Sequence, residues 1–313
     1  MGFNIVGIGE VLWDLLLTGP QLGGAPANFS YHAHALGAKV HVITCVGNDD
    51  YGREVIRRFH ALGLPDATVQ VDANRPTGTA SVALSGDGVA HFTIHENVAW
   101  DCIAEPPEAA AAASVAHAIC FGTLAQRCAL SRNTIQRLLA QTPANALRVF
   151  DINLRQQFYS RTVIEESLHL ANVLKLNADE LPALAKIFSL AGSPEKQIVQ
   201  LAETFSLRLV ALTRGPNGSL LYQNQSGKIR WSDCPSLPVR VVDTVGAGDS
   251  FTAALVLGLL HEMDLGEINK IANEVASYVC SQAGATPPMP EEFAGRFLEK
   301  GKGTASVVPP AAP

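Results

Sequence analysis

The chain alternates strand-like and helix-like segments along most of its length, and this order limits the folds it can adopt. Strand-like runs occupy residues 3–8, 39–46, 118–121, 148–152, 173–176 and 209–213. Helical runs lie between them, such as residues 25–36, which stop at Gly37, and residues 51–62, which stop at Gly63. Alternation of this kind predicts an α/β fold with a mainly parallel sheet.

One segment departs from this order. From Thr79 to His95, small and β-branched residues alternate with polar ones around Ser85-Gly86-Asp87-Gly88. An Asp-Gly pair between alternating strands indicates a β-hairpin, which we place at residues 81–94. A hairpin inserted into a layered α/β fold must cover something or pair with something, so it is a candidate lid. Residues 301–313 are small, polar and proline-rich, and we expect a C-terminal tail there.

The composition favours a globular protein of the cytoplasm. Apolar residues make up 47% of the chain and charged residues 17%, which suits a packed core. The net charge of −6, without any block of like charge, gives no sign of a nucleic-acid-binding surface. The six cysteines form no C-x-x-C pair, so we expect free thiols in a reducing compartment. The longest apolar stretch, residues 251–260, is about half a membrane span, and no signal peptide or membrane partner is expected.

Two familiar phosphate-binding motifs are absent from the sequence. Gly7-Ile8-Gly9 follows a strand, but Leu12 stands where the dinucleotide-binding fingerprint requires a third glycine. No G-x-x-x-x-G-K-[ST] run occurs, which excludes a P-loop. Any phosphate site must therefore come from another pattern.

A different glycine motif gives the strongest indication of phosphate chemistry. The run D-T-V-G-A-G-D-S-F-T begins at Asp243 and leads into an apolar helix over residues 253–260. The helix start and its small residues predict an anion hole for phosphate oxygens, formed by the backbone N–H groups of Gly246, Ala247 and Gly248. Asp249 would face a phosphoryl group there, where a carboxylate suits removal of a proton from an attacking hydroxyl. The alternative is a carboxylate that only caps the helix, and the motif alone does not decide between the two.

This run resembles the C-terminal signature of the ribokinase-like, or PfkB-type, sugar kinases. The N-terminal signature of that family has a counterpart in G-G-A-P-A-N-F, which starts at Gly23. Further similar segments are N-A-D-E at Asn177, T-R-G-P-N-G at Thr213, and Gly284-Ala285. The resemblance implies a three-layer α/β/α fold with a mostly parallel central sheet. It also implies a kinase domain over residues 1–300, with a small β-sheet lid from about residues 10–22 and 72–100.

The resemblance assigns a sugar site to Asp14, Gly23, Gly24, Asn28, Asn153 and Arg155. A carboxylate such as Asp14 can accept hydrogen bonds from paired hydroxyls, with a solvated loop residue as the alternative. The D-I-N-L-R run ends a strand, where α/β sheets bind ligands. Arg155 could contact substrate or phosphate, or form only a structural ion pair. Weaker candidates are Gln126, Arg127 and His95.

The resemblance places the nucleotide at Asn177, Thr213, Gly215, Gly218 and Asn273. Glu180, with Asn177, is expected to organise Mg²⁺ through water, since Mg²⁺ keeps several waters. From the residues alone, the favoured interpretation of Glu180 is an exposed carboxylate in the first turn of a helix starting near Asn177. Asp243, with carbonyls around residues 283–285, is expected to hold a monovalent cation, K⁺. The expected co-substrate is ATP.

The expected activity is phosphorylation of a hydroxymethyl group of a small sugar by in-line transfer from ATP, with Asp249 as the base. Segments such as residues 9–14 and 98–101 are similar to those of bacterial fructokinases, so fructose is the favoured substrate, giving fructose 6-phosphate. The alternatives are 2-keto-3-deoxygluconate or another sugar or nucleoside. A sugar or nucleotide sensor without catalysis is an alternative of another class. An exposed lid edge could also pair two copies into a homodimer.

Overall fold

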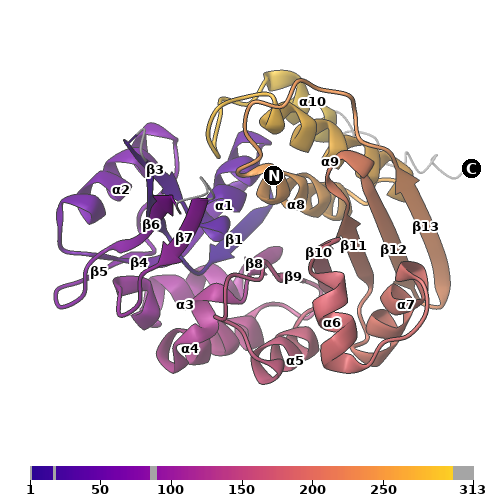
Figure 1. The fold of residues 1–313 in the computed structure, drawn as a ribbon, viewed down its shortest axis with the longest axis horizontal. Coiled ribbons are helices and arrows are strands. Elements are labelled where there is room, and N and C mark those ends of the chain that lie inside the picture. The colour runs from indigo at the N-terminus through magenta and orange to yellow at the C-terminus, as the bar shows by residue number, and fades with distance from the viewer. Residues whose placement is uncertain (1, 17–18, 85–89, 299–313) are drawn as a thin grey trace, which may run out of the picture.

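The strand-like runs of the sequence pair side by side in one large sheet, as the computed structural model of the chain shows (Figure 1). The structure describes residues 2–16, 19–84 and 90–298. Across these residues the sheet has nine strands in the order β13 (Lys228–Cys234), β12 (Ser219–Gln225), β11 (Leu209–Thr213), β10 (Val173–Asn177), β9 (Leu147–Asp151), β8 (Ala118–Phe121), β1 (Asn4–Ile8), β4 (Lys39–Gly47) and β5 (Val69–Asp72). The strands from β11 to β5 run parallel, and β12 and β13 add an antiparallel edge.

Helices cover both faces of this sheet (Figure 1). The upper layer in the view contains α1 (Ala25–Ala35), α8 (Ala247–Leu260), α9 (Leu265–Cys280) and α10 (Glu291–Leu298), with α2 (Asp50–Ala61) at the side. The lower layer contains α3 (Pro107–Ser114), α4 (Ala129–Gln141), α5 (Arg161–Leu170), α6 (Leu181–Phe188) and α7 (Pro194–Thr204). Short 3₁₀ turns occur at η1 (Ala99–Cys102), η2 (Leu124–Arg127) and η3 (Gly215–Asn217).

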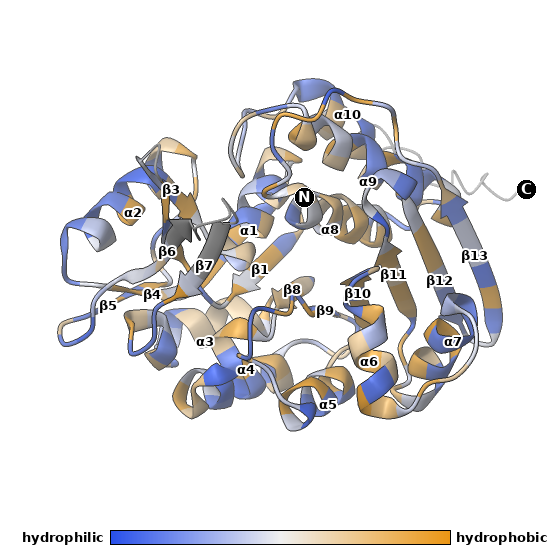
Figure 2. Cartoon of the chain, viewed as in Figure 1, coloured by the Kyte–Doolittle hydropathy of each residue, from blue (hydrophilic) through white to orange (hydrophobic). Residues whose placement is uncertain are grey.

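The core is split between the two layers because side chains alternate across a strand. On β11, Leu209 and Ala211 pack with α1, α8 and α9, whereas Val210 and Leu212 pack with the helices of the lower layer. Figure 2 shows the central strands as predominantly hydrophobic and the outer surfaces of the helices as more hydrophilic. Strands buried on both faces explain the nearly continuous apolar runs of the sequence.

A second, four-stranded sheet lies beside the large one. Its order is β3 (Gly19–Gly23), β2 (Leu12–Leu16), β6 (Gly78–Leu84) and β7 (Ala90–Ile94). β2 pairs antiparallel with β3 and parallel with β6, and β6 and β7 form the predicted hairpin. Trp13 anchors β2: its side chain is buried and its indole N–H donates to the Tyr51 carbonyl of α2 at 3.1 Å. The predicted turn at residues 85–88 lies outside the described residues.

The sequence predicted most of these elements, and the differences are local. All six strand-like runs form strands, and the mainly parallel sheet and three-layer fold are confirmed. The helix expected near Asn177 starts instead at Leu181, because the Asn177 side chain accepts from the Asp179 and Glu180 N–H groups and forms a turn first. The edge hairpin of β12 and β13 was not predicted. All six cysteines are free, and no helix among the described residues has the length and apolar character of a membrane span.

Candidate active site

The candidate site lies at the carboxyl-terminal edge of the large sheet, where the strand order reverses. β1 has β4 on one side and β8 on the other, so the chain moves in opposite directions across the sheet from this point. Ligands of open α/β sheets bind at such a switch point. Gly122 follows β8, Asp151 ends β9, and Asp249 comes from the first turn of α8; the three residues border one narrow space. A strand and a helix thus position the acids Asp151 and Asp249.

The N-terminus of α8 is built by glycine. Gly246 is the N-cap residue in the left-handed region (φ 80°), where a residue with a Cβ is strained. A Cβ there would lie 2.3 Å from the Ala285 carbonyl oxygen, so glycine also permits the close approach of the loop at residues 283–285. Ala247 and Gly248 begin the helix, whose first N–H groups have no carbonyl of the same helix to bind. This geometry suits an anion, and the anion hole stays a prediction of the sequence.

Asp249 occupies the first turn of α8 and is held in place by α1. The Asn28 side-chain amide donates to Asp249 Oδ2 at 2.9 Å. Burial raises the pKa of Asp249 to about 6, and the negative charge of Asp151 adds to this rise. The Asn28 hydrogen bond and the cations Lys175 and Arg155 act in the opposite direction. Asp249 is therefore mainly a carboxylate at pH 7 and has the proton affinity that a general base requires.

The predicted sugar residues Asp14 of β2 and Gly23 of β3 are diagonal neighbours, and the Asp14 carboxylate lies against Gly23. Asp14 pairs with Gln21 and Leu12 with Gly23, and a Cβ at Gly23 would lie 2.6 Å from Asp14 Oδ2. Gly24 has φ 113°, and its Cβ would lie 2.5 Å from the Glu10 carbonyl oxygen. Burial raises the pKa of Asp14, while nearby Arg155 lowers it. The two glycines therefore keep the backbone close to the candidate sugar-binding acids.

Glu10 is a further acid of this region that the sequence did not single out. It follows β1 by two residues, and its side chain is only 4% exposed. Its Oε2 atom is buried without a hydrogen-bond partner among the described residues. Burial raises the pKa of Glu10 to about 7; its own N–H, Arg155 and the Ala25 N–H lower it, and Asp249 raises it. The signal available in the sequence was an acid directly after the first strand.

A buried ion pair lies behind Asp249 and was also missed. Lys175 on β10 donates to Asp151 Oδ1 at 3.0 Å, and both side chains are 7% exposed. The Thr252 hydroxyl of α8 lies 2.9 Å from Asp151 Oδ2 as a donor. Burial lowers the pKa of Lys175, but Asp151, Glu180 and Asp249 outweigh burial and raise it above its ordinary value. Lys175 is thus a permanent cation beside the candidate site.

Asn153 and Arg155 follow Asp151 in the loop after β9. Asn153 has φ 41°, so the backbone turns sharply at this point. Arg155 is exposed, and its guanidinium lowers the pKa of Glu10, Asp14 and Asp249. The structure therefore places Arg155 near the three acids, where a bound anion or hydroxyl would meet it.

The predicted magnesium residue Glu180 is fixed by backbone N–H groups. Its Oε1 accepts from Leu154 N at 2.9 Å and its Oε2 accepts from Asn177 N at 2.8 Å. Burial raises the pKa of Glu180, whereas Lys175 and these N–H groups lower it. Each oxygen keeps a second lone pair for a water. No three His, Cys, Asp or Glu side chains group as metal ligands in the described ranges.

The remaining nucleotide candidates shape loops at the other side of α8. Gly218 has φ 80°, and a Cβ there would lie 2.0 Å from the Cys234 carbonyl oxygen, so only glycine fits this turn. Gly215 also has positive φ, and open space surrounds it. Thr213 ends β11, with its hydroxyl 3.4 Å from the Leu176 carbonyl. Asn273 is buried on α9, and its amide donates to Ser219 Oγ at 2.7 Å.

Asp243 connects two loops through backbone N–H groups. Its Oδ1 accepts from Val245 N at 3.0 Å and its Oδ2 accepts from Gly284 N at 3.1 Å. The carboxylate thereby ties the segment before Gly246 to the loop at residues 283–285. The segment also carries exposed apolar side chains, namely Val239, Val241, Val242 and Val245.

The weaker sequence candidates have structural partners. Arg127 forms a buried ion pair with Asp101 at 2.8 Å, and its guanidinium lies 3.9 Å from the Trp100 ring centroid. Gln126 is buried and donates to the Gly122 carbonyl at 2.8 Å. The His95 ring lies between the hydroxyls of Thr79 and Ser81 on the small sheet. Each of the three residues thus has a partner within the protein, while Arg127 Nη1 is buried without one among the described residues.

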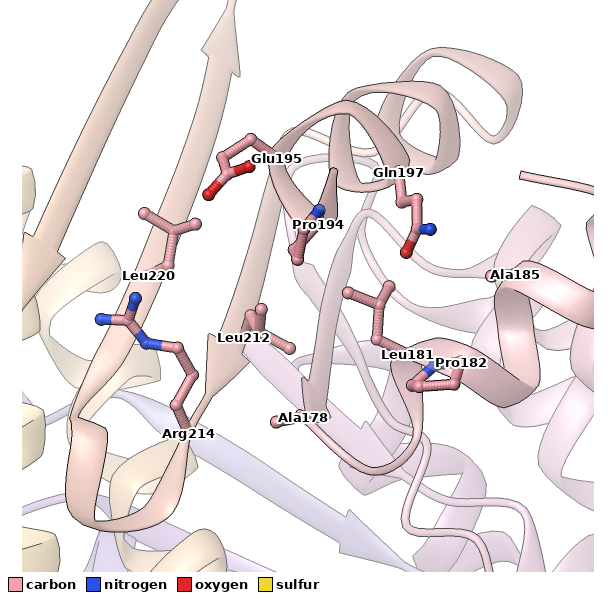
Figure 3. Close-up of a pocket in the computed structure, with 10 residues that line it drawn as sticks. All are labelled: Ala178, Leu181, Pro182, Ala185, Pro194, Glu195, Gln197, Leu212, Arg214 and Leu220. Carbon is pink, nitrogen blue, oxygen red and sulfur yellow. The ribbon is translucent and has the colours of Figure 1, made fainter. Parts of the chain in front are cut away.

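A separate pocket of about 470 Å³ lies between α6, α7 and the ends of β11 and β12 (Figure 3). Leucine, proline and alanine side chains form most of its wall, and Glu195, Gln197 and Arg214 supply its polar groups. Arg214 neighbours Thr213, but the pocket is on the face of the sheet opposite α8. It therefore contains none of the acids described above.

Comparison with known proteins places this site in a family. Residues 19–292 match the profile of the pfkB family carbohydrate kinases. A protein of Pyrococcus horikoshii named as a putative sugar kinase is 31% identical over 309 residues, covering 90% of this chain and 91% of the relative. Fructokinase-1 of Zea mays is 28% identical over 317 residues, covering 92% and 95% of the two chains. The chain belongs to the pfkB family of carbohydrate kinases.

The fold is that of the ribokinase-like kinases. The crystal structure of fructokinase with bound ATP from Xylella fastidiosa superposes with a TM-score of 0.81 at 21% identity, covering 95% of this chain and 98% of that one. The resemblance stated from the two glycine signatures is therefore correct, and the protein is a sugar kinase.

Proposed function

We propose that the protein phosphorylates the hydroxymethyl group of a small sugar with ATP, and that fructose is converted to fructose 6-phosphate. The observation that carries this proposal is the placement of Asp249 in the first turn of α8, beside the anion hole and bonded to Asn28 of the sugar signature. One carboxylate thus adjoins the place for a phosphoryl group and the place for a hydroxyl. Such an arrangement suits proton removal during phosphoryl transfer.

In the proposed reaction the sugar hydroxyl lies against Asp249. The Asp249 carboxylate accepts its proton while the hydroxyl oxygen attacks the γ-phosphorus of ATP and ADP leaves in line. The backbone N–H groups at the start of α8 bind the oxygens of the transferring group, whose charge they stabilise. Asn28 keeps Oδ2 of the base fixed, and the small sheet covers the site and excludes water.

The nucleotide is proposed to lie between the start of α8 and the turn at Thr213–Gly218. Exposed valines of the segment before Gly246 offer an apolar surface to the adenine ring. Mg²⁺, held through water by Glu180, would neutralise phosphate charge when bound. A K⁺ ion at Asp243 and the carbonyls of residues 283–285 is a further prediction.

The choice of fructose rests on the similarity to fructokinases and on the acids of the sugar side. Glu10 and Asp14 offer acceptors for sugar hydroxyls, as a neutral polyol requires. Arg155 favours a second candidate, 2-keto-3-deoxygluconate, because a cation near the acids could pair with its carboxylate.

The test is a coupled assay of ADP release with ATP, Mg²⁺ and K⁺ over fructose, tagatose, ribose, 2-keto-3-deoxygluconate, fructose 6-phosphate and adenosine. We expect the highest kcat/KM with fructose, and no sugar-dependent release from the Asp249→Asn variant. A preference for another sugar would retain the mechanism and replace the substrate. Absence of turnover over the whole panel would contradict the proposed activity and favour a sensor.

A further inference from the structure

Directly behind the first turn of α8 lies a charged pair that general packing does not explain. Lys175 of β10 and Asp151 of β9 are buried on the α8 side of the sheet, 3.0 Å apart, each 7% exposed. Burying two charges in this way is costly, and an apolar pair of the same size is often as stable. The pair therefore needs a reason beyond stability.

The pair contacts α8 at two points. Thr252 of α8 donates to Asp151 Oδ2 at 2.9 Å, and its hydroxyl also lies 2.9 Å from the Gly248 carbonyl. At Gly248 a Cβ would lie 3.0 Å from Lys175 Nζ, so the ammonium group directly adjoins the backbone of the anion hole. Asp151 holds the ammonium in this place, and glycine at position 248 leaves room for it.

We propose that Lys175 and Asp151 act as a positioning pair for phosphoryl transfer: Lys175 supplies a fixed positive charge at the base of the α8 N-terminus, and Asp151 sets where that charge lies. This inference rests on the proposed kinase function. Neither residue needs to touch a substrate, because both act on Asp249 and on the backbone of the anion hole. The sequence signal is the K-L-N run, in which Lys175 precedes Asn177 by two residues.

The two members of the pair should act on Asp249 with opposite sign. Lys175 favours the Asp249 carboxylate and Asp151 disfavours it. The titratable and charged groups around Asp249 are Asp151 on β9, Lys175 on β10, Arg155 after β9, Glu10 after β1 and Cys120 on β8. The other three are unchanged when one member of the pair is replaced, so the direction of the effect identifies which member was removed.

The experiment is a titration by NMR of protein carrying ¹³C-labelled aspartate carboxyls, without substrate, and Asp249→Asn assigns the resonance. In Asp151→Asn the Asp249 midpoint is expected to fall by about one pH unit or more. In Lys175→Met the Asp151 and Asp249 carboxyls are expected to take up a proton at higher pH, by a shift of similar size. The double variant is expected to titrate near the parent, and the acid limb of kcat is expected to move with the NMR midpoint.

Arg127→Met is the matched control, since it breaks a pair of equal burial, with side chains 7% and 8% exposed, away from α8. It is expected to lower stability without moving the Asp249 midpoint. Shifts of both single variants in the same direction, or no shift, would overturn the proposal. If Lys175→Met does not fold, the Asp151→Asn variant decides the test, because asparagine keeps the shape of the side chain. An unchanged Asp249 midpoint in this variant would overturn the proposal. Because the titration needs no turnover, an inactive parent enzyme would refute the kinase function separately.

Discussion

The acids on the proposed sugar side of the site and those on the proposed nucleotide side use their oxygens differently. Glu10 has a buried oxygen that finds no hydrogen-bond partner in the described part of the chain, and Asp249 accepts a hydrogen bond from one side-chain amide. Glu180 and Asp243 instead accept a backbone N–H group on each oxygen. The first group therefore has acceptors in reserve for a substrate, whereas the second group shapes loops. We therefore expect sugar binding to depend mainly on the chemistry of these side chains. Nucleotide binding is expected to depend mainly on the geometry of the backbone.

The largest expected effect concerns Asp249. If the enzyme kept its activity without this carboxylate, the contrast between the two groups of acids would have no functional meaning. Asp249→Asn is expected to lower kcat by about 10²–10⁴-fold, because the amide keeps the shape but removes the base. In the parent, kcat should rise with pH through about 6 as Asp249 ionises, since its pKa is raised to that value. Steady-state kinetics between pH 5 and 8 measure both effects. Asp50→Asn, in the first turn of α2, is the matched control and should leave kcat unchanged.

On the nucleotide side the strongest effect should come from a backbone position. Gly246→Ala puts a side chain at φ 80° and within 2.3 Å of the Ala285 carbonyl oxygen. We expect a loss of about 1–3 kcal/mol in stability from the strain and a fall in kcat/KM for ATP of about 10-fold or more as the anion hole moves. Gly295→Ala, in open space on α10, is the control. Normal ATP kinetics in Gly246→Ala would contradict the assigned anion hole.

The Asp14→Asn variant tests whether Asp14 serves the sugar or the nucleotide. Loss of a charged acceptor for sugar hydroxyls is expected to raise the KM for the sugar by about 10-fold or more, since such hydrogen bonds contribute about 1.5–3 kcal/mol. The KM for ATP should stay within a factor of about two. A rise in the KM for ATP instead would move Asp14 to the nucleotide side.

Glu180→Gln tests whether a loop-shaping acid also serves the metal. The amide can accept only one of the two backbone N–H groups, so stability should fall by about 1–3 kcal/mol. The Mg²⁺ concentration for half-maximal rate should rise by about 10-fold, because the loss of a residue that holds a metal through its ligands weakens metal binding by about that factor. Calorimetric unfolding and a Mg²⁺ titration of kcat measure the two. A loss of stability at unchanged Mg²⁺ dependence would leave Glu180 a purely structural residue.

The smallest expected effect concerns Glu10. Its folded pKa is raised to about 7, above the ordinary value of 4.5, so the neutral acid stabilises the fold at low pH and this contribution is lost as pH rises through 7. Glu10→Gln should therefore lose less thermal stability than the parent as the pH rises from 4.5 to about 7. The KM for sugar should change by about 2- to 5-fold and become less dependent on pH. Identical pH dependence in both proteins would contradict the raised pKa.

The sequence was sufficient where the determinants are local. Strands of the central sheet are buried on both faces, so their apolar runs are visible without a partner. The glycine run before α8 was visible because Gly246 has a positive φ, but the helix, expected over residues 253–260, begins earlier, at Ala247, and takes Asp249 into its first turn. The hairpin of β12 and β13 could not be predicted from the sequence, because β13 is an exposed edge strand whose polar and apolar residues are mixed.

The missed part of the site depends on residues that only the fold brings together. Lys175 and Asp151 are 24 positions apart and meet because β9 and β10 are parallel neighbours. Glu10 gains its raised pKa from burial among α1 and the loops, which no local pattern reports. Arg127 resembled a ligand-binding residue at a strand end, but its partner Asp101 lies in η1, 26 positions earlier.

The bond from Asn28 to Asp249 spans 221 positions of the chain. During synthesis, the segment of the proposed sugar site is made early, whereas the proposed base and the start of α8 are made more than 200 residues later. In the proposed mechanism, a nascent or truncated chain that lacks α8 would hold neither a phosphoryl group nor an activated hydroxyl. Such a chain is therefore expected to consume no ATP.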